Sequence, residues 1–240
     1  MSSPYLLLGG DDSLWASPER VRKGFISKVY GILSLQLVAT ALIASPFVLV
    51  DHAKVQHFIF TNMWLLWFSL VVSLSTILVY ACIPRLMREF PINYLLLALF
   101  TVAEGISVGF VSSLYSTASV VIALGLVATV TLSLSIFAAK TTIDFTKALW
   151  PYLIALSVVM IGAGLFLLIF PSQVGITVYS AMGAMLFSVY IVFDTQMILG
   201  GKNEIHFSVD DYVPAAISLY VDIVSLFIYF LQLFGQRRTD

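Results

Sequence analysis

The chain has 240 residues, of which 60% are hydrophobic and 10% are charged, and its formal net charge is −1 at pH 7. A soluble domain of this size does not need so much apolar surface, so the composition predicts a membrane protein that crosses the bilayer several times. No basic cluster resembles a nucleic-acid-binding surface, and the single cysteine, Cys82, excludes an intramolecular disulfide.

Residues 1–28 predict a short cytosolic tail, because their apolar stretch is too short for a signal peptide and lacks a basic start. Seven apolar runs follow, each about 20 residues or longer and therefore able to cross a hydrocarbon core of about 30 Å as a helix. The runs are Tyr30–Val50, Asn62–Ile83, Asn93–Tyr115, Ala118–Ala139, Leu149–Phe170, Ile176–Leu199 and Tyr212–Phe234. We therefore expect an all-α membrane protein, with one seven-transmembrane-helix bundle at residues 29–235 and a short tail at 236–240.

Positive charge is concentrated on one side of these expected spans. The basic residues are Arg20, Arg22, Lys23 and Lys28 before the first run and Arg85, Arg88, Lys140, Lys147 and Lys202 in alternate loops, whereas the opposite loops hold only Lys54. The positive-inside rule therefore puts the N-terminus in the cytosol and the loop with His52 and His57 on the other side. Seven full crossings would leave Arg237 and Arg238 opposite the cytosol, so the last run is either a full crossing or a re-entrant segment.

Two acids inside the last two runs are the first candidates for function. Asp194 and Asp222 lie in stretches that are otherwise apolar, where an unpaired carboxylate is costly. Counting along the helices places both acids in the cytosolic half, at depths that differ by roughly 6 Å. Two such groups in contact cannot both ionise cheaply, so we expect them to share a proton and to act as a pH sensor and gate. The alternative is a protonated acid that bonds a backbone carbonyl and has a purely structural role.

Three further charged residues extend this candidate site. Arg85 and Arg88 end the second run at the same cytosolic level, where a guanidinium can hydrogen-bond the acids as a latch, or else anchor the helix to lipid headgroups. Glu104 lies about 16 Å into the third run, near the midplane, where it is either part of a Ca²⁺ path or a neutral structural group. Asp194, Asp222 and Glu104 are therefore the candidate oxygen ligands for a Ca²⁺ ion.

Two segments near the C-terminus carry a family resemblance. The sequences FDTQMILGGK (Phe193–Lys202) and DDYVPAAISLYVDIVSLF (Asp210–Phe227) resemble the signature of the transmembrane Bax inhibitor motif family, and the run Gly200–Asn203 is similar to its lifeguard branch. The resemblance implies a seven-helix bundle with the C-terminal helix at its centre. It also implies a pH-sensitive Ca²⁺ leak across an intracellular membrane, of the Golgi or the endoplasmic reticulum, and a role in suppressing cell death.

The same resemblance implies roles for individual residues. The family's paired membrane aspartates match Asp194 and Asp222, and its latch arginine matches Arg85 or Arg88. We therefore expect a channel whose partners are membrane lipid, Ca²⁺ and protons, and which needs no cofactor. The alternative is a non-transporting adaptor that regulates apoptosis through membrane protein partners. A receptor or an enzyme is the weakest interpretation, because no intramembrane Ser–His pair or metal motif occurs.

Overall fold

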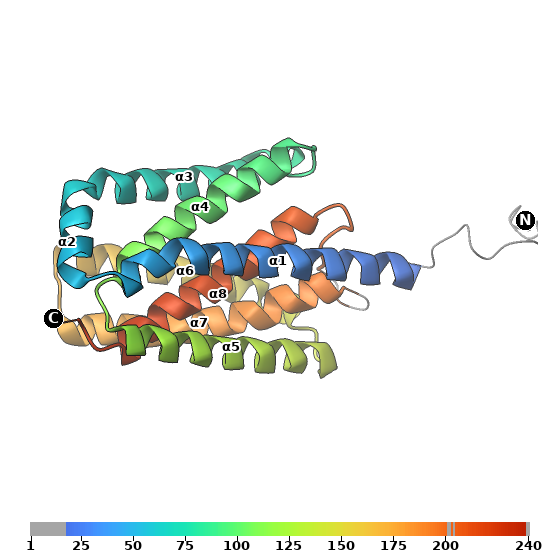
Figure 1. Ribbon diagram of the computed structural model, residues 1–240. Helices are drawn as coiled ribbons and strands as arrows, with labels where there is room; N and C mark the ends of the chain where they lie inside the picture. Colours follow the sequence, from blue (N-terminus) through green and yellow to red (C-terminus); the bar gives the residue numbers. More distant parts are fainter. Residues whose placement is uncertain (1–17, 201–202, 204, 239–240) are drawn as a thin grey trace, which may run out of the picture.

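The computed structural model describes residues 18–200, 203 and 205–238, and Figure 1 shows them as a bundle of long helices. The helices are α1 (Pro18–Leu49), α2 (His52–Thr61), α3 (Met63–Cys82), α4 (Ile92–Ser112), α5 (Thr117–Lys140), α6 (Phe145–Ile169), α7 (Gln173–Leu199) and α8 (Tyr212–Phe234), with a short 3-10 helix, η1 (Pro84–Met87), before α4. Among these residues, seven helices are long and apolar enough to cross a membrane, which confirms the predicted all-α fold with seven spans.

Two elements differ from the expectation. The first helix begins at Pro18, inside the segment expected to be a tail, and the expected outer loop contains the additional helix α2. Asp51 starts α2 as its N-cap, because its carboxylate accepts a hydrogen bond from the Lys54 amide at 3.3 Å. At about 1.5 Å per residue, this 10-residue helix is too short to cross the membrane. His52 and His57 are therefore helical residues rather than loop residues.

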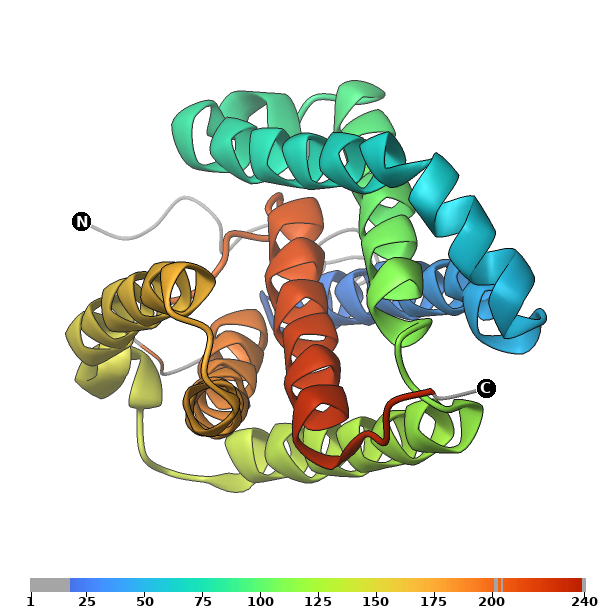
Figure 2. The ribbon, with the colours of Figure 1, turned by 90° about the vertical axis from the view of Figure 1, so that its left-hand side faces the viewer.

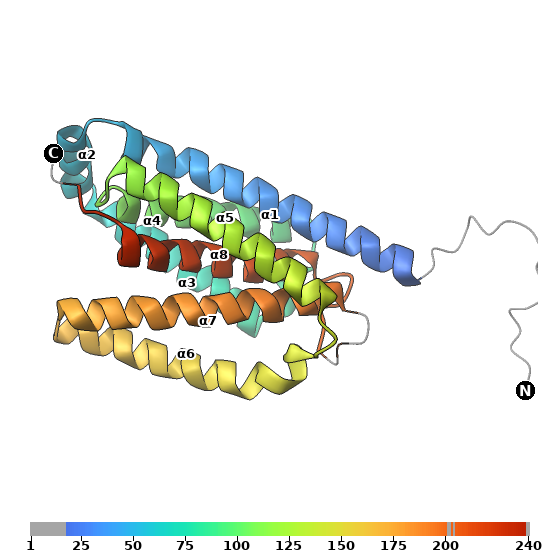
Figure 3. The same cartoon turned by 90° about the horizontal axis from the view of Figure 1, so that it is seen from below.

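The C-terminal helix α8 is the central element of the bundle. Viewed from one end in Figure 2, α8 lies in the middle, and it packs against α1, α4, α5 and α7. The other two spans are peripheral, since α3 packs mainly on α4 and α6 packs mainly on the outer side of α7 (Figure 3). Polar side chains of α8 are consequently removed from lipid and surrounded by protein.

The last helix is long and apolar enough for a full crossing, which is the first of the two alternatives for this segment. It has 23 residues, and in Figure 1 it ends at the opposite end of the bundle from the start of α1. Below, the N-terminal end is the end where α1 begins, and the C-terminal end is the end where α8 finishes. Arg238 at the C-terminal end donates hydrogen bonds to the carbonyls of Val48 at 3.2 Å and Val50 at 3.4 Å. Carbonyls at a helix C-terminus attract cations, which accounts for a basic residue at this end.

Close packing of α4 on α1 depends on two small residues. Gly109 faces the ring of Phe47 so closely that a Cβ there would collide, and a Cβ at Gly105 would press tightly on the side chain of Ile43. The Gly-x-x-x-Gly spacing therefore lets two membrane helices approach, as such motifs commonly do. This contact fixes α4, and with it Glu104, against the interior of the bundle.

Candidate functional site

Asp194 and Asp222 lie on α7 and α8, the two helices with the most extensive mutual packing in the bundle. Their side chains are 5% and 4% exposed. The two carboxyl groups face each other at interacting distance, so the structure brings together the two acids that stood out in the sequence. The site is therefore buried between the central helix and its closest neighbour.

The surroundings of this pair contain an unfilled hydrogen-bonding position. The Oδ2 atom of Asp222 is buried and has no hydrogen-bond partner. In the described part of the chain, neither salt bridge involves Asp194 or Asp222. A buried acceptor without a partner is costly, and a proton held between two carboxyl groups supplies one. The arrangement is thus chemically suited to bind and release a proton.

Hydrogen bonds to neighbouring elements fix the part of α7 that carries Asp194. One turn before the acid, the Tyr190 hydroxyl lies 2.7 Å from the Ser157 hydroxyl of α6. Two residues after it, the buried side-chain amide of Gln196 donates to the Ile143 carbonyl at 2.9 Å, in the connection between α5 and α6. Asp194 is therefore held between two fixed points on its own helix.

The two expected latch arginines have different partners. Arg85 binds Glu89 at 2.7 Å, whereas Arg88 binds both carboxylate oxygens of Asp211, at 2.6 and 3.1 Å. Both arginines are at the surface, with side chains 87% and 52% exposed, and neither hydrogen-bonds the buried acids among the residues described. Since Asp211 directly precedes α8, Arg88 connects to the helix of Asp222 indirectly. The bond with Asp211 raises the pKa of Arg88, so its charge is constant over the physiological pH range.

A third arginine, Arg22, binds the end of α7. From the sequence, Arg22 was expected only as one of the basic residues before the first span. The Arg22 guanidinium donates to the carbonyls of Met197 at 2.7 Å, Leu199 at 3.1 Å and Phe207 at 2.6 Å. Its carbon lies 4.7 Å from the ring centroid of Phe25, one turn away on α1. The last carbonyls of a helix lack intrahelical partners and carry partial negative charge, so a guanidinium stabilises them.

Another cation contacts the start of α8. The Lys28 ammonium lies 3.2 Å from the ring centroid of Tyr212, the first residue of that helix. The Tyr212 hydroxyl also accepts a hydrogen bond from the Asn93 side chain at 3.1 Å. Together with Arg22 on the same helix, and with Arg88 just after η1, Lys28 holds the connection between the two acid-bearing helices. The only sequence signal for this arrangement was the presence of basic residues at one end of the bundle.

Glu104 occupies a second polar site on the other side of α8. Its half-buried side chain faces Ser73 of α3. The Ser73 hydroxyl is buried and forms no hydrogen bond. Nearby, the Tyr220 hydroxyl of α8 lies 2.7 Å from the Thr40 hydroxyl of α1. Tyr220 and Asp222 are two positions apart, which is about 200° around a helix. The central helix therefore stands between Glu104 and the aspartate pair.

The three acids do not form one ligand cluster. Within the described ranges, no group of three or more His, Cys, Asp or Glu side chains is arranged to hold a metal ion. Dedicated Ca²⁺ sites usually supply about six to eight oxygen ligands. Asp194 and Asp222 form one acidic position, and Glu104 forms a separate one.

Comparisons with known proteins agree with this architecture. A family model described as inhibitor of apoptosis-promoting Bax1 (Bax1-I) matches residues 22–239. Protein lifeguard 3 of Homo sapiens is 36% identical over 223 residues, which cover 91% of this chain and 70% of that protein. Protein LIFEGUARD 4 of Arabidopsis thaliana is 36% identical over 235 residues, which cover 94% of this chain and 91% of that protein. The chain therefore belongs to the Bax inhibitor-1-like family of multi-pass membrane proteins, and its relatives there include lifeguard proteins.

Proposed function

We propose that this protein is a pH-sensitive Ca²⁺ leak channel, gated by a proton shared between Asp194 and Asp222. The observation that carries the proposal is the contact of two buried carboxyl groups on adjacent membrane helices. A shared proton links α7 to α8. Loss of that proton leaves two carboxylates that repel each other. Gain of a second proton makes both groups neutral, and a hydrogen bond between neutral groups is weaker than one to a carboxylate. Either change weakens the link, so the contact between the helices depends on pH.

A Ca²⁺ ion crossing the membrane needs polar groups at more than one depth. Asp194 and Asp222 provide one level, toward the N-terminal end of the bundle. Glu104 provides a second, and its position beside Ser73 and the central helix supports a place on the ion path. The ion would then pass two separate acidic positions rather than stop at a closed site.

The basic residues at the N-terminal end support a latch that acts on the helices carrying the acids. Arg88 binds Asp211 at the start of α8, and Arg22 binds the end of α7. These bonds oppose separation of α7 from α8 at the end nearest the pair. In this proposal, Arg88 is the latch of the two candidates, and Arg22 acts with it.

The orientation and cellular role are part of the same proposal. Arg22 and Lys28 lie in the first part of α1, and Arg85 and Arg88 lie between α3 and α4. Figure 1 shows both segments at the N-terminal end of the bundle, for which the positive-inside rule favours the cytosolic side. The family description, inhibitor of apoptosis-promoting Bax1, supports a role in suppressing cell death. We place the protein in a Golgi or endoplasmic reticulum membrane, where a Ca²⁺ leak sets the filling of the store.

Ca²⁺ flux into liposomes that contain only this protein tests the proposal. The wild type should conduct Ca²⁺ at a rate that varies between about pH 5 and pH 8, the range accessible to a coupled carboxyl pair. Asp194→Asn and Asp222→Asn should each change the rate and flatten this variation. Asp210→Asn, which alters an exposed acid in the connection between α7 and α8, is the matched control and should keep the wild-type profile.

The outcomes separate the two functional classes. An unchanged pH profile in both Asn variants would remove the pair as the sensor. No Ca²⁺ flux from correctly folded wild-type protein would remove the channel, and would favour a non-transporting adaptor that regulates apoptosis through protein partners.

A further inference from the structure

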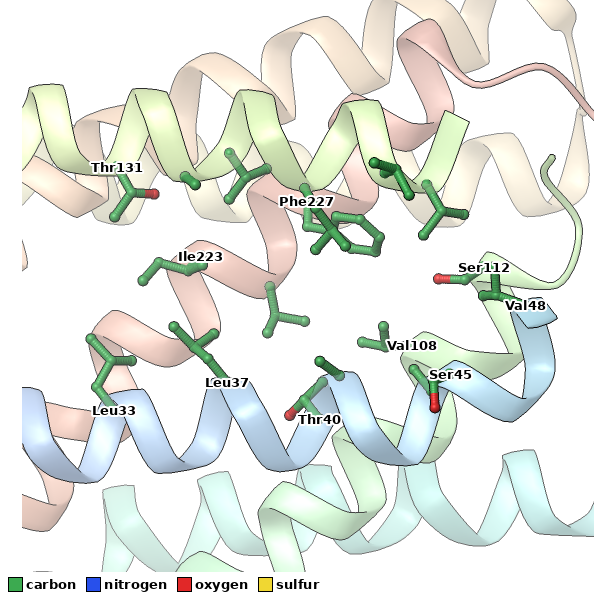
Figure 4. A pocket seen from close by; sticks show the side chains of 18 of the residues that line it. Leu33, Leu37, Thr40, Ser45, Val48, Val108, Ser112, Thr131, Ile223 and Phe227 are labelled. Atoms are coloured by element: carbon green, nitrogen blue, oxygen red, sulfur yellow. The ribbon is translucent and has the colours of Figure 1, made fainter. Parts of the chain in front are cut away.

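A long apolar groove runs between α1 and α5, with α4 and α8 forming its floor. Its volume is about 550 Å³, within the range of about 300–1,000 Å³ found for ligand pockets. Figure 3 shows α1 and α5 running alongside each other, and the close-up in Figure 4 shows the side chains between them. The groove extends along α1 from Tyr30 to Leu49, which is about 29 Å at 1.5 Å per residue. One leaflet of hydrocarbon is about 15 Å deep, so the groove can hold an extended acyl chain.

The groove opens sideways toward the membrane. Leu49 of α1 and Val121, Leu124 and Leu132 of α5 line it and are also exposed on the outside of the bundle. In a bilayer, this opening faces lipid rather than water. Hydrocarbon is therefore the material available to fill the groove.

A buried hydroxyl group in the groove has no partner of its own. Ser112 is 1% exposed, lines the groove and makes no side-chain hydrogen bond. In Figure 4 its oxygen points into the space between the helices. A buried hydroxyl without a partner is costly, and the ester carbonyl of a phospholipid is an acceptor that reaches this depth.

Two arginines stand at the mouth of the groove, at the C-terminal end of the bundle. Arg238 binds the Val48 carbonyl at 3.2 Å, and Arg237 forms a backbone bridge with Tyr115, just before α5. Val48 and Thr117 line this mouth, and the Thr117 hydroxyl donates to the Val48 carbonyl at 3.3 Å. Basic residues at the end of an apolar groove complement a lipid headgroup with negative charge.

We propose that the groove between α1 and α5 binds one anionic phospholipid from the leaflet at the C-terminal end of the bundle. Its acyl chain lies along α1 and α5, an ester carbonyl accepts a hydrogen bond from Ser112, and its phosphate contacts Arg237 and Arg238. The lipid contacts α1, α4, α5 and α8 together, and it fills the gap between α1 and α5, which make few direct contacts with each other. The site is separate from the aspartate pair, which lies between α7 and α8.

Lipid retention by the purified protein tests this site. Protein in detergent is incubated with equal amounts of phosphatidylglycerol and phosphatidylcholine with the same acyl chains, passed through a column, and extracted so that each retained lipid is counted per chain. The wild type should retain about one phosphatidylglycerol and at least fivefold less phosphatidylcholine. Ala128→Phe, which projects a ring into the groove from α5, should lower retention of both lipids about tenfold. Ile122→Phe, on the same helix but outside the groove lining, is the matched control.

The headgroup contact has its own pair of variants. Arg237→Gln should reduce the preference for phosphatidylglycerol roughly fivefold, the equivalent of about 1 kcal/mol for one basic residue near an anionic surface. Lys54→Gln, at the same end of the bundle but on α2, should leave the preference unchanged. If Ala128→Phe does not fold, Ala41→Phe fills the groove from α1 and replaces it. Equal retention of both lipids by the wild type, equal loss in the groove variant and its control, or no retained lipid would each overturn the proposal.

Discussion

The two sides of the central helix α8 contain buried polar groups of different kinds. On the side facing α7, Asp222 meets Asp194, and one of its carboxylate oxygens has no hydrogen-bond partner. On the side facing α1, the Tyr220 hydroxyl lies 2.7 Å from the Thr40 hydroxyl, and neither group is left without a partner. Burial in a membrane bundle therefore does not by itself distinguish a switch from a structural contact. The difference lies in whether a buried group still has an open position for a proton.

Glu104 belongs to the second side but shares a property of the first. Its carboxyl group carries a potential charge, and the Ser73 hydroxyl that it faces does not complete a hydrogen bond. An acid that is not held by a fixed partner is available to a passing cation. In the proposed channel, proton sensing belongs to one side of α8 and ion contact to the other.

The largest effect that would sharpen this contrast is expected from Glu104→Gln. The change keeps the shape and removes the charge, so Ca²⁺ leak in liposomes should fall roughly tenfold, equivalent to about 1.4 kcal/mol of lost ion stabilisation. The pH dependence should remain, because Asp194 and Asp222 are intact. Ser73→Ala, which removes a hydroxyl without removing charge, is the control. A folded Gln variant that conducts Ca²⁺ like the wild type would exclude Glu104 from the path.

A smaller effect is expected from Arg22→Gln. The variant loses charge-assisted hydrogen bonds to the end of α7, each of which contributes about 1.5–3 kcal/mol in favourable settings. Leak at neutral pH should therefore rise about threefold, with a lower thermal unfolding midpoint. Lys23→Gln removes the neighbouring, exposed positive charge and should have neither effect. Equal leak from both variants would show that the hydrogen bonds of Arg22 are unimportant to the gate.

Arg88→Ala should have a weaker effect on the same measurement. Its bond to Asp211 is exposed to solvent, which screens it, so leak at pH 7 should rise no more than about twofold. Because the bond with Asp211 raises the pKa of Arg88, the arginine keeps its charge between pH 7 and pH 5. Arg85→Ala is the matched control, since Arg85 binds Glu89 near the same helix end. A larger increase from Arg85→Ala would reverse the assignment of the latch.

The smallest effect is expected from a change at Tyr220, on the side of α8 that faces α1. Tyr220→Phe removes the hydrogen bond to Thr40 and should lower stability by about 1 kcal/mol. Thermal unfolding in detergent measures the loss. The pH profile of the leak should be unchanged, because the variant leaves the face of α8 that carries Asp222 as it is. A flattened profile would mean that the two sides of α8 do not act separately.

Local patterns in the sequence were sufficient to predict the seven spans and the two acids on consecutive helices. Long apolar runs set the spans, and a carboxylate within such a run is conspicuous without any knowledge of its neighbours. The additional helix α2 was missed because its 10 residues, which include His52, Lys54 and His57, are too few and too polar for a membrane span. Its N-cap at Asp51 was the available signal.

Pairings between distant parts of the chain could not be predicted in the same way. Arg22 binds carbonyl groups more than 170 residues away, and carbonyl acceptors leave no trace in the sequence. The sequence placed Arg85 and Arg88 at the correct end of the bundle, but only the structure distinguishes the Glu89 partner of one from the Asp211 partner of the other. Separation of Glu104 from the aspartate pair likewise depends on which face of α8 each acid meets.

Infrared difference spectroscopy of the protein in liposomes tests the central claim most directly, because a protonated carboxyl group has a stretching band distinct from that of a carboxylate. Spectra recorded at steps between about pH 5 and pH 8 would be compared with Ca²⁺ leak measured on the same preparation. The account predicts a protonated-carboxyl band that changes over the same pH interval as the leak and is altered in both Asp194→Asn and Asp222→Asn. A band that is unaffected by either substitution, or a leak that changes with pH while the band does not, would contradict it.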